Sequence, residues 1–118
     1  MRENIIKDKS FNFAVRIVNL YKWLITEKKE YVLSKQLLRS GTSVGAMVRE
    51  AEHAESKADF IHKMAIAQKE INESIYWLDL LNATDFINKD LFESINNDAV
   101  EIIKLITSII KGVKRNLK

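Results

Sequence analysis

Apolar residues recur every three or four positions in four long stretches of the sequence, a spacing typical of amphipathic α-helices. The spacing predicts helices over residues 10–27, 31–55, 57–82 and 88–116. Short polar connections between such helices favour antiparallel neighbours. We therefore expect a single all-α domain, residues 1–118, that folds as an antiparallel up-down-up-down four-helix bundle.

Polar residues stand where three of these helices would begin. Ser10, Ser56 and Asn88 are the expected N-caps of the first, third and fourth helices, because their side chains can accept a hydrogen bond from a first-turn amide. Ser56 is followed three residues later by Asp59, which approximates a capping box with Asp in place of Glu. These caps predict where the helices start.

The composition excludes several other classes of protein. The sequence has no proline and three glycines, which argues against a β-sheet protein rich in tight turns. It also has no cysteine, so disulfides, thiolate metal ligands and cysteine nucleophiles are excluded. Its longest apolar runs fall far short of the ~20 residues that span a membrane. Because the charged first ten residues lack the apolar core of a signal peptide, we expect a cytoplasmic protein with no membrane partner.

Small residues cluster in the second predicted helix, over positions 40–46. Gly41 and Gly45 lie four residues apart there, and each costs about 1 kcal/mol against alanine in a helix interior. We expect a continuous helix in which these glycines allow a neighbouring helix to approach closely. The alternative is that Gly41 ends one helix and that Thr42 or Ser43 caps another.

The fourth predicted helix is apolar over more than one stripe. The residues that make its apolar arc so wide are Ile102, Ile103, Ile106, Ile109, Ile110 and Val113, and Ile61 and Ile66 lie off the main stripe of the third helix. Surplus apolar surface on a small domain usually marks a partner surface, which favours a homo-oligomer. The alternative is a fourth helix that is deeply buried within the monomer.

Charge is distributed unevenly along the chain, whose net charge is +3. Residues 31–49 and 104–118 contain basic side chains and no acidic ones, whereas residues 50–59 and 84–103 are mainly acidic. A basic helix face and a basic tail are typical of nucleic-acid binding. The candidate phosphate contacts are Lys35, Arg39, Arg49, Lys111, Lys114, Arg115 and Lys118. Alternatively, acidic and basic patches neutralise each other at the ends of the bundle, and the tail complements the helix dipole.

Two Glu/Asp-x-x-His pairs raise the possibility of a metal-binding bundle. They are Glu50 with His53 and Asp59 with His62, and Glu70 and Glu73 could add further ligands. Both pairs straddle the predicted turn between the second and third helices, where a solvated position is the simpler interpretation. We find no phosphate-binding loop and no nucleophile elbow, so we expect no metal, no cofactor and no enzymatic activity.

Two segments resemble a known family. Ser34-x-Gln36-Leu37-x-Arg39-Ser40-x-x-Ser43-Val44-Gly45-Ala46-x-x-x-Glu50-Ala51 is similar to the second-helix signature of the four-helix-bundle proteins encoded in 23S rRNA intervening sequences. The third-helix signature of this family is matched by Asp59-Phe60, Ile66-Ala67, Lys69-Glu70, Glu73 and Tyr76-Trp77-Leu78. Met47 departs from the pattern, since the family usually has Asn there.

The resemblance implies a four-helix bundle that assembles into a ring-like homopentamer. Relatives include the accessory protein of diversity-generating retroelements, which is thought to bind nucleic acid and a reverse transcriptase. The matched polar positions are also consistent with a structural polar network or interface between helices or subunits, built from Gln36, Ser43, Glu50, Lys69, Glu70 and Glu73 beside Arg39.

We therefore expect a non-enzymatic, self-associating bundle that acts as a binding or scaffolding protein. Its expected partners are further copies of itself and RNA or a nucleic-acid-processing protein. The alternatives are the metal-binding bundle and a purely structural oligomer with no ligand.

Overall fold

The computed structural model describes residues 2–116, with side chains from Ile5 onward. Lys118, one of the candidate phosphate contacts, lies outside the described residues. Four α-helices and no strand occur in this described part, so the prediction of a four-helix, all-α protein is confirmed. The helices are α1 (Arg2–Glu27), α2 (Leu33–Glu52), α3 (Lys57–Ala83) and α4 (Lys89–Arg115).

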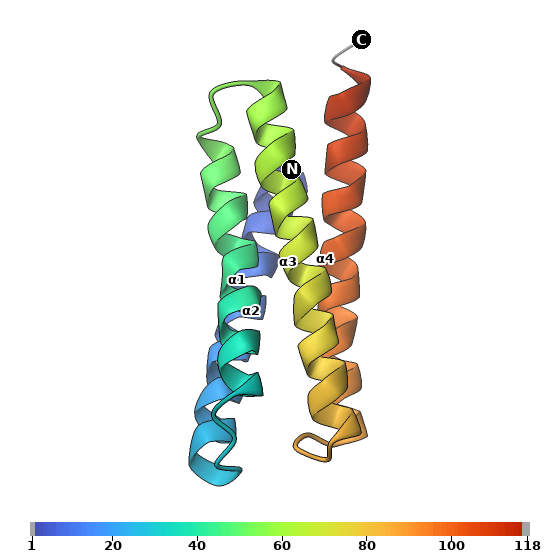
Figure 1. Ribbon diagram of the computed structural model, residues 1–118. Helices are drawn as coiled ribbons and strands as arrows, with labels where there is room; N and C mark the ends of the chain where they lie inside the picture. The colour runs from blue at the N-terminus through green and yellow to red at the C-terminus, as the bar shows by residue number, and fades with distance from the viewer. Residues whose placement is uncertain (1, 117–118) are drawn as a thin grey trace.

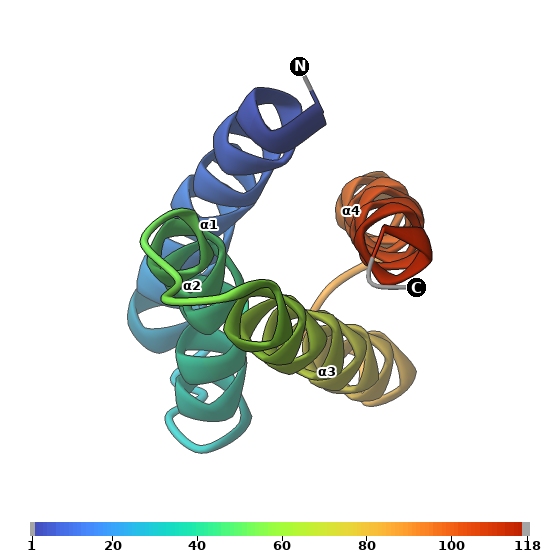
Figure 2. The same cartoon turned by 90° about the horizontal axis from the view of Figure 1, so that it is seen from above.

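The helices pack around one shared centre in an elongated bundle of 50 × 22 × 20 Å. Each helix packs against the next, and α1 also packs against α4, whereas the diagonal pairs make no close backbone contact within residues 2–116. The α2–α3 connection lies at the same end as the last turn of α4, and the other two connections lie at the opposite end (Figure 1). Figure 2 looks along the bundle from the α2–α3 end.

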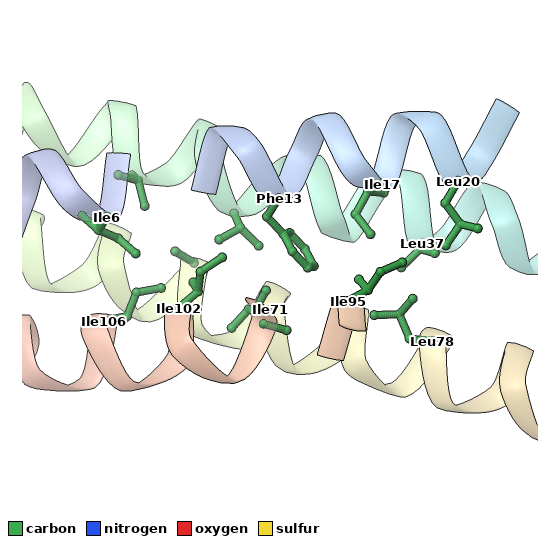
Figure 3. Packing of buried hydrophobic residues seen from close by; sticks show 14 of the residues in the cluster. Ile6, Phe13, Ile17, Leu20, Leu37, Ile71, Leu78, Ile95, Ile102 and Ile106 are labelled. Atoms are coloured by element: carbon green, nitrogen blue, oxygen red, sulfur yellow. The ribbon is translucent and has the colours of Figure 1, made fainter. Parts of the chain in front are cut away.

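One continuous apolar core runs along the centre of the bundle (Figure 3). All four helices contribute to it, and its largest fully buried side chains include Phe13, Ile17, Leu37, Ile71, Leu78, Ile95 and Ile102. Full burial of such a side chain stabilises the folded state by about 1.5–3 kcal/mol. This core holds the four helices in place and so positions the side chains on their surfaces.

The first helix begins eight residues earlier than predicted, at Arg2 instead of residue 10. Ser10 is therefore not an N-cap: it is buried inside α1, and its hydroxyl donates to the Lys7 carbonyl oxygen at 3.2 Å. The helix extends because Ile6 is buried on the face that also carries Phe13.

The caps predicted for α3 and α4 are confirmed. The Ser56 hydroxyl accepts from the Asp59 amide at 3.0 Å, and the Asn88 side-chain oxygen accepts from the Leu91 amide at 2.8 Å. The Asp59 carboxylate in turn accepts from the amide of Glu55, at 3.2 Å. The first hydrogen bond of the predicted capping box is therefore present. In the second, the Asp59 carboxylate accepts from the amide of Glu55 instead of that of Ser56.

The second helix begins at Leu33, two residues later than predicted, because Glu30 organises the turn before it. The Glu30 carboxylate accepts from three consecutive amides, those of Val32 at 3.1 Å, Leu33 at 3.0 Å and Ser34 at 2.6 Å. Burial raises the pKa of the Glu30 carboxyl, but these hydrogen bonds outweigh it and hold the pKa below its usual value. The periodicity gave no sign of this cap.

The small-residue segment lies within an unbroken α2, as expected. The two glycines allow α1 to pack closely against it. A Cβ atom at Gly41 would lie 2.8 Å from side-chain atoms of Ile17, and one at Gly45 would lie 3.4 Å from the Ser10 carbonyl oxygen.

Much of the wide apolar arc of α4 is used inside the monomer. Its buried members are Ile102, Ile106, Ile109 and Ile110, whereas Ile103 and Val113 are half-buried. Ile61 and Ile66 of α3 are half-buried as well. Half of the exposed large apolar side chains among the described residues lie on α1 instead, where Phe11 and Val15 are 51% and 44% exposed. For most of this apolar arc the alternative interpretation, burial within the monomer, is therefore the correct one.

None of the helices in the described part of the chain is long and apolar enough to span a lipid bilayer.

Candidate functional site

Arg39, a candidate phosphate contact, forms two ion pairs within the chain. It donates from Nη1 to Glu70 Oε2 at 3.0 Å and from Nη2 to Glu73 Oε1 at 2.7 Å. The Trp77 indole also donates to Glu73 Oε1, at 3.2 Å. Hydrogen bonding from Arg39 holds the pKa of the Glu73 carboxyl below its usual value. Two carboxylates therefore offset the charge of Arg39, although half of its side chain remains in contact with water.

The remaining residues of the expected polar network divide into two groups. Glu70 is buried beside a hydrogen bond between the Ser74 and Ser40 hydroxyls, 2.9 Å long, which joins α2 to α3. Gln36, Glu50 and Lys69 are exposed, and the Ser43 hydroxyl donates to the backbone of its own helix. Within residues 5–116, the structure thus brings together only Glu70 and Glu73 of that set, through Arg39.

Acidic residues of α4 form ion pairs with α1. Lys9 pairs with Glu101 at 3.0 Å, and Arg16 pairs with Asp98 at 2.8 Å. Arg16 also donates to the Ser94 hydroxyl, at 3.1 Å. Asp98 and Glu101 are therefore paired with α1 within the subunit, and Glu93, at the start of α4, pairs with Lys89 of its own helix at 3.9 Å. Neutralisation of the basic start of α2 between subunits stays a prediction.

Acidic residues near the α2–α3 turn also have partners other than the basic tail. Glu52 pairs with Lys7 at 3.3 Å, and Asp59 pairs with Lys63 at 3.0 Å. Hydrogen bonding from Lys63 holds the pKa of the Asp59 carboxyl below its usual value. The tail of α4 lies at this end of the bundle (Figure 1), yet these two carboxylates are paired elsewhere.

Cations on the last three turns of α4 have no ion-pair partner among the described residues. They are exposed, and they comprise Lys104, Lys111, Lys114 and Arg115, which we call the α4 cation cluster. Lys104 and Lys111 are seven residues apart on one face, about 10 Å along the helix. With Arg115 they line a surface hollow of about 380 Å³ that also contacts Ile103, Thr107 and Ser108.

Lys104 was absent from the candidates named from the sequence, which near the end of α4 began at Lys111. The seven-residue spacing that places it beside Lys111 was the available signal. The candidates on α2 are more dispersed: Lys35 is exposed, and the Arg49 guanidinium lies over the Phe11 ring, 5.3 Å from its centroid. Neither residue has an ion pair within residues 5–116.

The four residues of the alternative metal site do not form a ligand set. Glu50, His53 and His62 are exposed around the α2–α3 turn, and Asp59 is engaged by Lys63 and the Glu55 amide. Across residues 5–116, no three His, Asp or Glu side chains converge closely enough to hold a metal ion.

The chain matches the family model of the 23S rRNA-intervening sequence protein over residues 2–108. It is also similar to the crystal structure, at 1.70 Å resolution, of a protein with unknown function from the S23 ribosomal protein family of Bacteroides thetaiotaomicron VPI-5482. The two are 63% identical with a TM-score of 0.93, over 94% of this chain and 99% of the other. No curated protein matches the sequence. Because the family model spans most of its length, the chain belongs to the 23S rRNA-intervening sequence protein family.

Proposed function

We propose that this protein is a non-enzymatic, antiparallel up-down-up-down bundle that self-associates as a homopentamer in the cytoplasm and binds RNA through the α4 cation cluster. The family to which the chain belongs supports RNA as the partner. Phosphate groups are the part of RNA that exposed Lys and Arg side chains recognise regardless of sequence.

The observation that carries this proposal is that, within residues 5–116, four exposed cations without an ion pair gather on the last turns of α4, whereas Lys35 and Arg49 are unpaired but dispersed. Acidic side chains of α3 and α4 engage Arg39, Arg16 and Lys9, but the cations of the α4 cluster have no such partner among the described residues. When a Lys or Arg side chain binds a phosphate, it releases the counterions of that phosphate. A cation without an ion pair can do so without first breaking a contact inside the protein. The α4 cluster therefore suits phosphate binding better than Arg39 does.

Self-association is supported by the exposed part of α1. Phe11 and Val15 lie one turn apart on the outer surface, and Arg49 of α2 stacks against Phe11. An aromatic ring and an arginine are the side chains most enriched in the cores of protein interfaces. Assembly into a ring would also repeat the α4 cluster around the oligomer, so that one RNA could contact several copies.

The test is fluorescence anisotropy of a labelled, structured RNA titrated at two salt concentrations. The key variant is Lys111→Gln/Lys114→Gln/Arg115→Gln. The matched control, Lys22→Gln/Lys28→Gln/Lys29→Gln, removes the same charge from the opposite end of the bundle, around the end of α1. Circular dichroism establishes that both variants are folded.

We expect the wild-type protein to bind more weakly as salt rises. The α4 variant should lose affinity, and its salt slope should fall by about one for each cation that contacts a phosphate. The control should lose much less. Equal losses in the two variants would show that only net charge matters and would overturn the assignment to α4. No binding by the wild type, even at low salt, would exclude RNA binding.

A further inference from the structure

A cavity of about 590 Å³ opens at the end of the bundle where α2 connects to α3. It lies between all four helices, because Ile6 of α1, Ala51 of α2, Met64 of α3 and Ile109 of α4 all line it. Figure 2 looks down on this end of the molecule. Pockets of about 300–1,000 Å³ are the size that holds small organic ligands.

The inner part of this cavity is apolar. Ile6, Val48, Ala51, Met64 and Ile109 line it, and each is no more than 3% exposed. Phe60 and Val113, both half-buried, form its sides. An unbranched hydrocarbon or a similar apolar group would be removed from water on such a surface, which is favourable by about 0.8 kcal/mol for each methylene buried.

The rim of the cavity carries one cation that has no ion-pair partner among the described residues. Lys57 is the first residue of α3, and no ion pair is found for it within residues 5–116. Glu52, the one carboxylate on the rim, is already paired with Lys7. The amino end of α3 also lies here, but its positive dipole end is already compensated by the Ser56 cap and by the Asp59 carboxylate of the first turn. Lys57 is therefore the group at the mouth that can pair with an anion, while the interior favours hydrocarbon.

We propose that this cavity binds a single-chain carboxylate amphiphile, of which a medium-chain fatty acid is the simplest example. The hydrocarbon chain would lie between the half-buried Phe60 and Val113, over the buried side chains that form the floor of the cavity. The carboxylate would lie at the rim beside Lys57, with Ser56 and Asn116 as neutral hydrogen-bonding neighbours. This site is separate from the hollow that the α4 cation cluster lines, so it does not depend on the proposed binding of RNA.

The test measures binding of decanoate and of decanol to the purified full-length protein by isothermal titration calorimetry. Lys57→Gln removes the cation from the rim and leaves the apolar lining intact. Its matched control is Lys89→Gln, because Lys89 is likewise the first residue of a helix, after the cap Asn88, but at the opposite end of the bundle. Ala54→Trp narrows the cavity from the turn after α2, and Val113→Trp narrows it from α4.

We expect decanoate to bind more tightly than decanol. Lys57→Gln should weaken decanoate about two- to fivefold, the range for an exposed ion pair, and leave decanol and the Lys89→Gln control unchanged. Ala54→Trp or Val113→Trp should abolish binding of both ligands. This result counts for a variant whose melting temperature equals that of the wild type. Absence of decanoate binding to the wild type would overturn the proposal, as would binding that survives the tryptophan in a folded variant. Equal binding of the two ligands would overturn the assignment of a carboxylate.

Discussion

Gly41 lies directly against Ile17, so closely that a Cβ atom on Gly41 would be 2.8 Å from both Cγ1 and Cγ2 of Ile17. Real Cβ atoms do not approach carbon atoms to that distance, so the packing of α1 on α2 at this level requires glycine. At Gly45, one turn further along α2, the nearest atom to a Cβ would be the Ser10 carbonyl oxygen at 3.4 Å. That distance is an ordinary van der Waals contact.

This contrast predicts opposite effects of alanine at the two glycines. Gly45→Ala should leave stability unchanged or raise it by up to about 1 kcal/mol, because alanine is the better helix former. Gly41→Ala should lower stability by about 1–3 kcal/mol, because the added methyl group overpacks the contact with Ile17. Urea denaturation measures both. The double variant Gly41→Ala/Ile17→Ala should lose less stability than the sum of the losses of the two single variants. A fully additive result would contradict a direct clash.

Arg39 is predicted to stabilise the fold through Glu70 and Glu73. Arg39→Gln leaves the Glu70 carboxylate, whose side chain is 9% exposed, without its cation. We expect a loss of about 1–2 kcal/mol at neutral pH, at the low end for a buried charge because Arg39 itself is half exposed. Arg39→Lys keeps the charge but not the bidentate geometry, so its stability should lie between those of Arg39→Gln and the wild type. Unchanged stability of Arg39→Gln would contradict a structural role.

Glu30 is predicted to make stability depend on pH. Its pKa is lower in the folded protein than the usual value of 4.5, so the ionised form is the one that folding favours. The stabilisation should be complete above the unfolded pKa and should be lost as the pH falls through the lower, folded pKa. Glu30→Gln should cost about 1 kcal/mol at pH 7, as other helix caps do. In a denaturation series from pH 7 to pH 3, the unfolding free energies of the wild type and of Glu30→Gln should converge. A difference that stays constant with pH would contradict stabilisation by the ionised Glu30 carboxylate.

The outer surface of α1 is predicted to carry the contact between subunits. Phe11→Ser/Val15→Ser removes two exposed apolar side chains, each worth about 1.5–3 kcal/mol when fully buried. Sedimentation velocity should therefore give a dissociation constant for the oligomer at least about tenfold higher than that of the wild type. The control is Tyr76→Ser, which removes another exposed aromatic side chain, on α3. An unchanged sedimentation coefficient for the α1 variant, or an equal effect of the control, would assign the contact elsewhere.

Helix positions and caps were predictable from the sequence wherever the signal was local. Ser56 and Asn88 cap α3 and α4 as expected, because a cap depends on residues only three positions apart. The same rule failed at Ser10, where a serine of the correct type lies inside a helix. What distinguishes Ser10 is its burial beside Gly45 of α2, and that contact does not exist until the helices pack.

The candidate site was less predictable than the fold. From the sequence, Arg39 and the cations near the end of α4 were equivalent candidates for binding phosphate. They differ because α3 presents Glu70 and Glu73 to Arg39, whereas the acids nearest to the α4 cation cluster in sequence are engaged by Lys9 and Arg16 of α1. The relative rotation of packed helices decides such partnerships.

The sequence by itself therefore determined the helical periodicity, two of the caps, the small-residue segment and the family, because each of these is encoded by residues near one another in the chain. Only the tertiary structure decided which cations stay without a partner and where a cavity opens. Those features depend on contacts such as Lys9 with Glu101, which joins residues far apart in the sequence. Such contacts form only after the apolar core has set the rotation and register of each helix.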